Sequence, residues 1–279
     1  MWKGLPEALV FRQFFVYNRI RERGEFIRMR VELDCHTHTV SSGHAYSTWQ
    51  ENAHVAASRG LKLIANTDHA PSMPGGAHEY YFQNLGSLPK VYEGVRVLAG
   101  AEVNILNQLG DVDLPDPLLR KLDYVIASVH SPCIEWDTEF DVVTAYRQTM
   151  VNHPCITAIG HPDGTRLPGE AALDYDAFTD AAKQYGVLIE INNHSLAAAQ
   201  YSDKASRNYR TLLRYCREKE LFVILASDAH FSGYVGQMDE AVRLLEEEKF
   251  PGELVLNTCA ERFLTYLHER REGLGMGGV

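Results

Sequence analysis

The sequence Asp34-Cys35-His36-Thr37-His38-Thr39 combines a predicted strand end with two histidines. Val31 and Leu33 precede them, so the histidines lie where an apolar, buried strand is expected to end. With one residue between them, both imidazoles can turn toward one ion, and His44 adds a third imidazole within nine residues. Because imidazole is the commonest metal ligand, this spacing predicts a metal site at the strand's end. Hydrogen-bonded surface histidines are the alternative interpretation of the pair taken alone.

The bulk composition is that of a soluble globular protein. The chain has 279 residues, of which 45% are hydrophobic and 23% charged. A net charge of −10, spread along the chain, argues against a broad surface for nucleic acid or membrane. Five cysteines without a close Cys-x-x-Cys pair argue against a disulfide framework and predict a reducing cytoplasm. No apolar run reaches the roughly 18 residues of a membrane span.

Residues 1–29 differ from the rest of the chain. They contain six Lys or Arg against three Glu, and their apolar run is interrupted by Arg12 and Gln13. No small-residue cleavage site follows, so a signal peptide is not predicted. Two interpretations remain open: an N-terminal helix that docks on the domain, or a leader upstream of a natural start at Met29. Residues 30–279 show no linker and are predicted to form one domain.

From Val31 onward the chain repeats one unit, in which a short apolar run ends in a polar loop and a helical pattern follows. The runs are rich in Val and Ile and are continuous, which is typical of parallel strands buried on both faces. They cover residues 31–35, 61–66, 95–103, 124–129, 156–159, 187–191 and 222–226.

Helical patterns with readable ends lie between these runs. They cover 48–59, about 139–152, 174–185 and 203–219, with Ser47 or Thr48, Asp174 and Ser202 as N-caps and Gly60 and Gly186 as C-terminal stops. Two further helices, 236–249 and 259–270, flank a short apolar run at 254–256, and residues 273–278 are expected to fray. Seven strands at this spacing predict successive right-handed βα units closed into a barrel. No glycine-rich loop follows the first strand, which counts against a dinucleotide-binding sheet.

Metal-capable side chains end six of the seven predicted strands. Loops at the carboxyl ends of parallel barrel strands form the active face. Glu102 lies inside an apolar run, where an unpaired carboxylate costs several kcal/mol or must take a proton. The nine candidate ligands are His36, His38, His44, His69, Glu102, His130, His161, Asp228 and His230. This number exceeds the coordination of one tetrahedral zinc ion and fits two or three ions.

The motifs resemble those of the PHP (polymerase and histidinol phosphatase) family of metal-dependent phosphoesterases, and most closely its YcdX-type phosphatase branch. The likeness covers about residues 31–265 and does not include 1–29. The motifs are His-Thr-His-Thr at 36–39, Ser-Gly-His-Ala-Tyr-Ser at 42–47, Thr-Asp-His at 67–69, Glu-Val-Asn at 102–104, Gly-His-Pro at 160–162, Glu-Ile-Asn-Asn at 190–193 and Ser-Asp-Ala-His at 227–230.

This resemblance implies a distorted (β/α)7 TIM-like barrel, with parallel strands inside and helices outside, and a trinuclear metal site. Carried over by motif, the first ion would be held by His36, His38, Glu102 and Asp228. The second would be held by Glu102, His130 and His161, and the third by His44, His69 and His230. Three divalent ions are expected, with Zn favoured and Mn or Fe as alternatives.

Charge accounts for the chemistry that such a site would perform. Two cations about 3.5 Å apart lower the pKa of a shared water from about 15.7 toward 7, and the resulting hydroxide attacks phosphorus in line. The third cation stabilises the oxyanion or the leaving oxygen. Glu102, Asp228 and Asp68 are the residues assigned to catalysis. Asp68 either orients a ligand histidine from outside the ligand set or stabilises its own turn.

Substrate contacts are assigned to Arg166, Asn193 and His194. Arg166 follows the fifth strand and either clamps a phosphate or is a solvated surface residue. Asn193 and His194 follow the sixth strand, which has no predicted ligand. Further side chains expected at the mouth are Ser131, His78, Tyr80 and Tyr81, whereas His54, His153 and His268 are interpreted as structural.

The predicted function is hydrolysis of a small phosphorylated metabolite, a phosphomonoester. A phosphodiesterase or nuclease would use the same metals but would need a basic groove, and histidinol phosphatase activity ranks lower. An amidohydrolase would usually carry a bridging Lys at a middle strand, where this chain has Glu102. A metal-binding regulatory domain is the non-enzyme alternative. The oligomeric state stays open.

Overall fold

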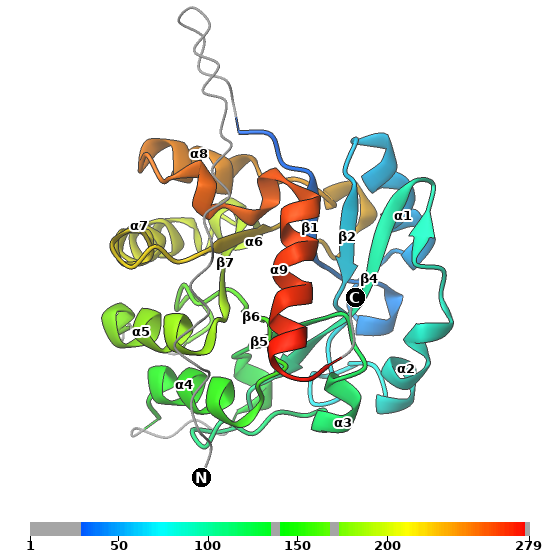
Figure 1. Ribbon diagram of the computed structural model, residues 1–279, viewed down its shortest axis with the longest axis horizontal. Coiled ribbons are helices and arrows are strands. Elements are labelled where there is room, and N and C mark those ends of the chain that lie inside the picture. Colours follow the sequence, from blue (N-terminus) through cyan, green and yellow to red (C-terminus); the bar gives the residue numbers. More distant parts are fainter. Residues whose placement is uncertain (1–28, 135–139, 168–172, 277–279) are drawn as a thin grey trace, which may run out of the picture.

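The structure, a computed structural model, describes residues 29–134, 140–167 and 173–276 (Figure 1). The two interpretations of residues 1–29 therefore fall almost entirely outside the described residues. Within them, seven parallel strands run in the order β1-β2-β4-β5-β6-β7-β8 and form a nearly closed barrel. They are β1 (Leu33–Thr37), β2 (Leu63–Asn66), β4 (Val95–Asn104), β5 (Tyr124–Ser128), β6 (Ala158–Ile159), β7 (Leu188–Asn192) and β8 (Val223–Ala226). The predicted distorted seven-stranded barrel is confirmed.

The first and last strands close the barrel by two different kinds of contact. Beyond the carboxyl end of β8, Thr37 and Ala229 form a parallel bridge, and His38 N donates to Ala229 O at 2.9 Å. Four residues earlier on both segments, the buried Asn257 donates to Leu33 O at 3.0 Å and to Leu225 O at 2.8 Å. One side chain thus connects the backbones of β1 and β8 where the strands do not pair.

The predicted helices surround the barrel. They are α1 (Trp49–Ser58), α4 (Val142–Asn152), α5 (Tyr175–Tyr185), α7 (Ser202–Glu218), α8 (Asp239–Glu247) and α9 (Ala260–Gly273). Thr48 caps α1 in a capping box with Glu51, and Asp174 caps α5, as predicted. Gly186 ends α5 with φ of +59°, the left-handed conformation that favours glycine.

Some predicted helix ends differ from the structure. Ser202 is the first residue of α7 and not its cap, because Ser202 N already bonds to Ala198 O at 2.9 Å in the preceding turn. The helix predicted over 236–249 begins at Asp239, and the helix predicted to end at 270 continues to Gly273.

Several short elements were not predicted, because each is too brief to show a hydrophobic period. They are β3 (Val91–Tyr92), which pairs antiparallel with β4, and α2 (Glu79–Asn84), α3 (Asp116–Leu119) and α6 (Asn193–Ala197). The apolar run at 254–256 falls in two 3-10 turns, Gly252–Leu254 and Leu256–Thr258.

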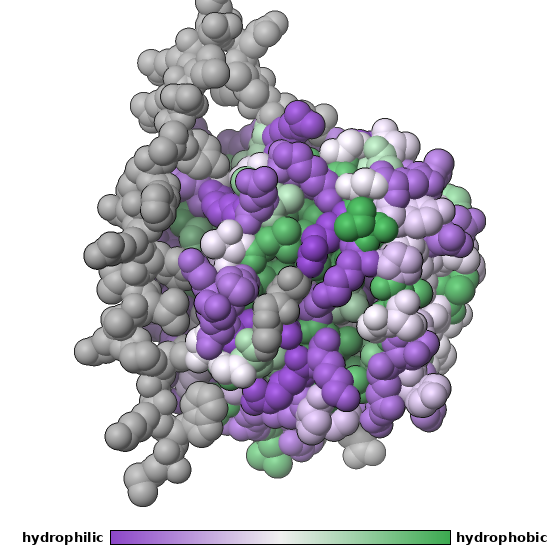
Figure 2. Space-filling model, turned by 45° about the vertical axis from the view of Figure 1, so that its right-hand side comes forward, coloured by the Kyte–Doolittle hydropathy of each residue, from purple (hydrophilic) through white to green (hydrophobic). Residues whose placement is uncertain are grey.

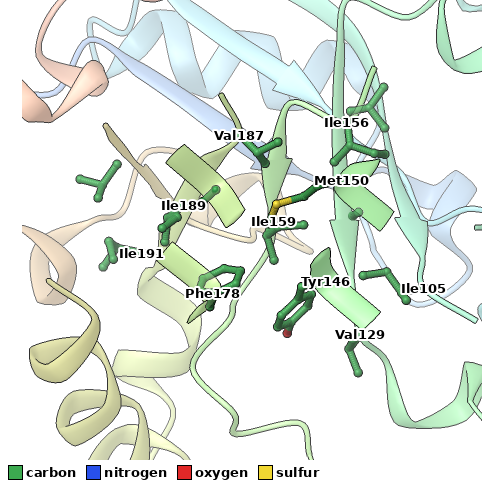
Figure 3. Packing of buried hydrophobic residues seen from close by; sticks show 14 of the residues in the cluster. Ile105, Val129, Tyr146, Met150, Ile156, Ile159, Phe178, Val187, Ile189 and Ile191 are labelled. Carbon is green, nitrogen blue, oxygen red and sulfur yellow. The ribbon is translucent and has the colours of Figure 1, made fainter. Parts of the chain in front are cut away.

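Hydrophobic residues pack on both the outer and the inner face of the barrel. The outer core joins β5, β6 and β7 to α4 and α5, as with Ile159, Ile189, Tyr146 and Phe178 in Figure 3. A second cluster draws side chains from all seven barrel strands and from α9, including Leu33, Leu98, Tyr124 and Phe263. Since every strand contributes to it, this cluster occupies the barrel interior, and α9 covers its end (Figure 1).

The surface in Figure 2 is largely hydrophilic, with scattered hydrophobic residues. Among the described residues, no helix is both long enough and apolar enough to cross a membrane.

Candidate metal centre

Histidines and carboxylates from six strand ends converge at the carboxyl-terminal mouth of the barrel. His36 belongs to β1 and Glu102 to β4, whereas the other candidate ligands lie in the loops that follow the strands. Asp228 and His161 adopt positive φ values, +54° and +30°. Such conformations are unfavourable for residues other than glycine and persist where the surrounding structure imposes them, often at functional sites.

Glu102 lies at the centre and is fully buried. Its Oε2 is 2.7 Å from His69 Nδ1, 3.3 Å from His36 Nε2 and 3.6 Å from His38 Nε2. One oxygen thus faces imidazoles from two different strands.

The other oxygen of Glu102 faces β5 and β6. Its Oε1 is 2.9 Å from His161 Nε2 and 3.3 Å from His130 Nε2, and it accepts a hydrogen bond from Ser128 Oγ at 2.7 Å. Gly160 makes room for this arrangement, because a Cβ there would lie 2.3 Å from Ser128 Oγ. Oε1 therefore faces the two histidines predicted for the second ion, whereas Oε2 faces the pair predicted for the first ion and also His69. The bridging role of Glu102 stays a prediction.

Asp228 also faces the first histidine pair, His36 and His38. Its Oδ1 is 3.3 Å from His38 Nε2 and 3.6 Å from His36 Nε2. The four residues predicted for the first ion, including Glu102, therefore lie together.

A third group lies at the outer edge of the cluster. His44 Nε2 and His230 Nε2 are 3.1 Å apart, and the His44 and His69 ring centroids are 4.9 Å apart. His44 is exposed, so this group is the most open of the three. His69 contacts both this group and Glu102.

The polar atoms of this cluster fit divalent cations. Four buried atoms at its centre form no hydrogen bond of acceptable geometry, although two of them, His69 Nδ1 and Glu102 Oε2, are 2.7 Å apart. They are His36 Nε2, His38 Nε2, His69 Nδ1 and Glu102 Oε2. Buried polar atoms are rarely left unpaired, because desolvation without a compensating partner is costly. Three sets of side chains offer ligand atoms within 4.8 Å of one another, namely His36, His38 and Asp228; His38, His69 and His230; and His69, Glu102 and His130.

Protonation states suit metal binding. Burial lowers the pKa of His130 to about 4, although the carboxylate of Glu102 opposes the shift. Burial, with His230 and His69 nearby, also lowers the pKa of His38 well below its usual value. Both imidazoles are therefore neutral at pH 7, as ligation requires.

The carboxylates are ionised. Burial raises the pKa of Glu102, but the combined effect of His36, His130 and His69 is larger and leaves this pKa well below its usual value. Burial lowers the pKa of His36, yet Glu190, Glu102 and Asp228 raise it well above its usual value. The excess of negative charge around His36 is what a cation would neutralise.

Comparisons with known proteins identify the family of this chain. The model of the PHP domain matches residues 34–194. A protein named probable phosphatase from Caldanaerobacter subterraneus subsp. tengcongensis is 42% identical over 90% of this chain and 96% of its own. The chain belongs to the PHP domain family.

Other matches extend across the PHP domain. A probable phosphatase from Photobacterium profundum is 38% identical over 87% of this chain and 96% of its own. Among solved structures, a histidinol phosphate phosphatase from Lactococcus lactis, in complex with Zn, L-histidinol and phosphate, superposes with a TM-score of 0.55. It covers 79% of this chain and 94% of its own, and at 19% identity it supports the fold alone.

A second layer of polar side chains orients the candidate ligands of this PHP domain. Glu190 Oε2 lies 2.8 Å from His36 Nδ1, and Asn104 Oδ1 lies 2.7 Å from His130 Nδ1. Glu190 is not among the site residues predicted from the sequence. The signal was present, because Glu190 is a carboxylate inside an apolar run, as Glu102 is.

Asp68 is fully buried and accepts five hydrogen bonds. Its donors are Thr39 N, Thr39 Oγ1, Ser42 Oγ, Asn66 Nδ2 and Tyr81 OH. Ser42 Oγ is also 3.0 Å from His38 Nδ1, so Asp68 reaches a candidate ligand through one hydroxyl. Asp68 therefore lies outside the candidate ligand set, and its donors other than Asn66 come from other segments rather than from the turn that follows it. Its catalytic role stays a prediction, and any such effect would be indirect.

The predicted substrate residues lie in different settings. Arg166 donates from Nη2 to Asp228 Oδ2 at 3.1 Å and from Nη1 to Ser195 Oγ at 2.9 Å, which places its guanidinium at the cluster. His194 is exposed at the start of α6. The carboxamide oxygen of Asn193 accepts from Glu240 N and Ala241 N, so it caps α8 and gives a substrate role no support.

The remaining residues predicted at the mouth either make hydrogen bonds to backbone groups or lie exposed to solvent. Ser131 Oγ donates to Arg166 O at 2.6 Å, His78 caps α2, and Tyr80 is exposed. The histidines interpreted as structural form peripheral pairs: His54 with Glu93, His153 with Asp116 and His268 with Glu272.

Proposed function

We propose that this PHP domain hydrolyses a small phosphomonoester at a site for three divalent ions. The observation that supports this most directly is the set of unpaired, buried imidazole and carboxylate atoms around Glu102. The two relatives named above carry the name probable phosphatase, which supports the same class of reaction. We also propose that residues 30–279 form the catalytic unit.

The first ion would bind His36, His38, Glu102 and Asp228, and the second would bind Glu102, His130 and His161. His44, His69 and His230 would hold the third. Imidazole with carboxylate suits Zn best, with Mn and Fe as alternatives.

When bound, the ions would activate a water molecule and neutralise charge on the phosphoryl group. The chain's own residues hold and orient the side chains that would bind the ions. Ser128 holds Oε1 of Glu102, and burial excludes bulk water from this carboxylate.

Arg166 is the residue that we expect to contact the phosphoryl oxygens. Its guanidinium is held between Asp228 and Ser195, with a side chain 19% exposed. A planar, permanently charged donor suits the bidentate recognition of phosphate.

The decisive experiment measures phosphate release by the purified protein after its metal content is determined. The panel contains p-nitrophenyl phosphate, small sugar and amino-alcohol phosphates including L-histidinol phosphate, and bis(p-nitrophenyl) phosphate. We expect about three divalent ions per chain and release from monoesters alone. Cleavage of the diester alone would favour a phosphodiesterase or nuclease, and full metal loading without turnover on any substrate would favour a regulatory domain.

A further inference from the structure

Glu190 is a buried carboxylate whose two oxygens contact two different candidate ligand residues. It lies in β7 and has no exposed surface. Its Oε2 is 2.8 Å from His36 Nδ1, and its Oε1 accepts from His161 N at 3.2 Å. We propose that Glu190 is a positioning residue that organises the ligands of the first and second ions together, an inference that rests on the proposed metal site.

Its contact with His36 selects the tautomer. As a metal ligand His36 is neutral and carries one N–H, and the carboxylate group of Glu190 beside Nδ1 holds the proton there. Nε2 then presents its lone pair toward Glu102 and Asp228, whose oxygens lie at 3.3 and 3.6 Å. Without an acceptor at Nδ1, His36 could place its proton on Nε2 and would lose that lone pair.

Its contact with His161 holds the backbone. His161 has φ of +30°, outside the usual range for a residue with a Cβ. The hydrogen bond from His161 N to Glu190 Oε1 helps to hold this conformation, from which His161 Nε2 approaches Glu102 at 2.9 Å.

A third contact extends this arrangement to Asp228. Asn192 Nδ2 donates both to Glu190 Oε1 at 2.8 Å and to Asp228 Oδ2 at 3.2 Å. Glu190 therefore contacts His36 and His161 directly and reaches Asp228 through Asn192.

Glu190 is not itself a ligand in this scheme. Both of its oxygens have hydrogen-bonding neighbours, whereas Glu102 Oε2 lies among imidazole nitrogens without forming a hydrogen bond of acceptable geometry. The candidate ligand sets among the described residues also do not include it. Two buried carboxylates of the same barrel thus differ in role: Glu102 faces the cations, and Glu190 faces the residues that hold them.

Glu190→Gln tests the proposal with almost no change of volume. An amide has one acceptor and one donor end. In one orientation its NH₂ group faces His36 Nδ1 and reverses the tautomer. In the other it faces two donors, His161 N and Asn192 Nδ2. The first orientation satisfies all three neighbours only by moving the His36 proton to Nε2, where it blocks a cation, and the second leaves His161 N and Asn192 Nδ2 without an acceptor.

The measurement is titration of the chelator-stripped full-length protein with Zn²⁺, and with Co²⁺ followed by visible absorption. We expect Glu190→Gln to weaken binding of two ions by about 10- to 100-fold and to leave the third, at His44, His69 and His230, unchanged. Glu190→Asp keeps the charge but withdraws it by one methylene, so it provides a second variant if the first does not fold. We expect a smaller loss of affinity for the same two ions.

Asn257→Ala is the matched control, because it removes buried hydrogen bonds to Leu33 O of β1 and Leu225 O of β8, and its side chain has no hydrogen bond to a candidate ligand. It should lower the thermal midpoint without changing metal affinity. Wild-type affinity for all ions in a folded Glu190→Gln protein would overturn the proposal. Absence of phosphate release by the wild-type protein would instead count against the proposed function, since the titration does not depend on turnover.

Discussion

The two halves of the barrel interior are equally buried but chemically opposite. Near the amino ends of the strands, Leu33, Leu98 and Tyr124 pack against Phe263 of α9. Near the carboxyl ends, Glu102 and Glu190 are also completely buried, but among imidazoles and other polar groups. Burial alone therefore does not distinguish the core from the site.

The same strands build both halves. Leu98 and Glu102 both belong to β4, and Leu188 and Glu190 both belong to β7. Alternate residues of a strand point to the same face, so a change of residue type after one or two inward positions converts core into site. The apolar half stabilises the fold by removing surface from water. The polar half carries unpaired atoms, so we expect bound cations to stabilise it.

The largest effect is expected from Glu102→Gln, which alters the polar half without changing its volume. Loss of the charge removes the predicted bridge between two ions. Turnover should fall by about 10³-fold, with loss of most metal at two positions. Metal analysis and phosphate release measure this, with Glu269→Gln on the exposed face of α9 as control. Full activity in Glu102→Gln would contradict the bridging role.

A substitution in the apolar half should have the opposite signature. Phe263 is completely buried and packs edge-to-face on Tyr124 with ring centroids 5.7 Å apart. Phe263→Ala should lower the free energy of unfolding by about 3–5 kcal/mol through lost burial and a cavity. Denaturant unfolding measures this, with Glu269→Ala as the exposed control. The folded protein should keep its metal content and kcat, and a parallel loss of metal would show that the two halves are coupled.

The smallest effect is expected at the rim of the polar half. Arg166→Ala removes a charged donor beside Asp228 without removing a candidate ligand. KM for phosphomonoesters should rise by about tenfold or more, with metal content unchanged, because a hydrogen bond to a charged group contributes roughly 1.5–3 kcal/mol. Steady-state kinetics test this against Arg147→Ala on the exposed face of α4. An unchanged KM would make Arg166 a structural residue.

Local signals carried most of the fold prediction. Continuous apolar runs marked all seven barrel strands, since strands buried on both faces need apolar side chains throughout. Thr48, Asp174 and Gly186 marked helix ends because capping depends on near neighbours in sequence. The prediction that Ser202 is an N-cap is wrong, because its backbone N–H donates to Ala198 O in the preceding turn.

The sequence by itself determined the barrel and the residue types at its carboxyl-terminal mouth, because both depend on local pattern. Only the tertiary structure decided which atoms face one another. It brought Glu190 beneath His36, 154 positions away in sequence, and turned the Asn193 oxygen toward α8. It also surrounded Asp68 with donors from separate segments. These contacts join strands and loops distant in sequence, so they depend on how the barrel closes, which no local pattern encodes.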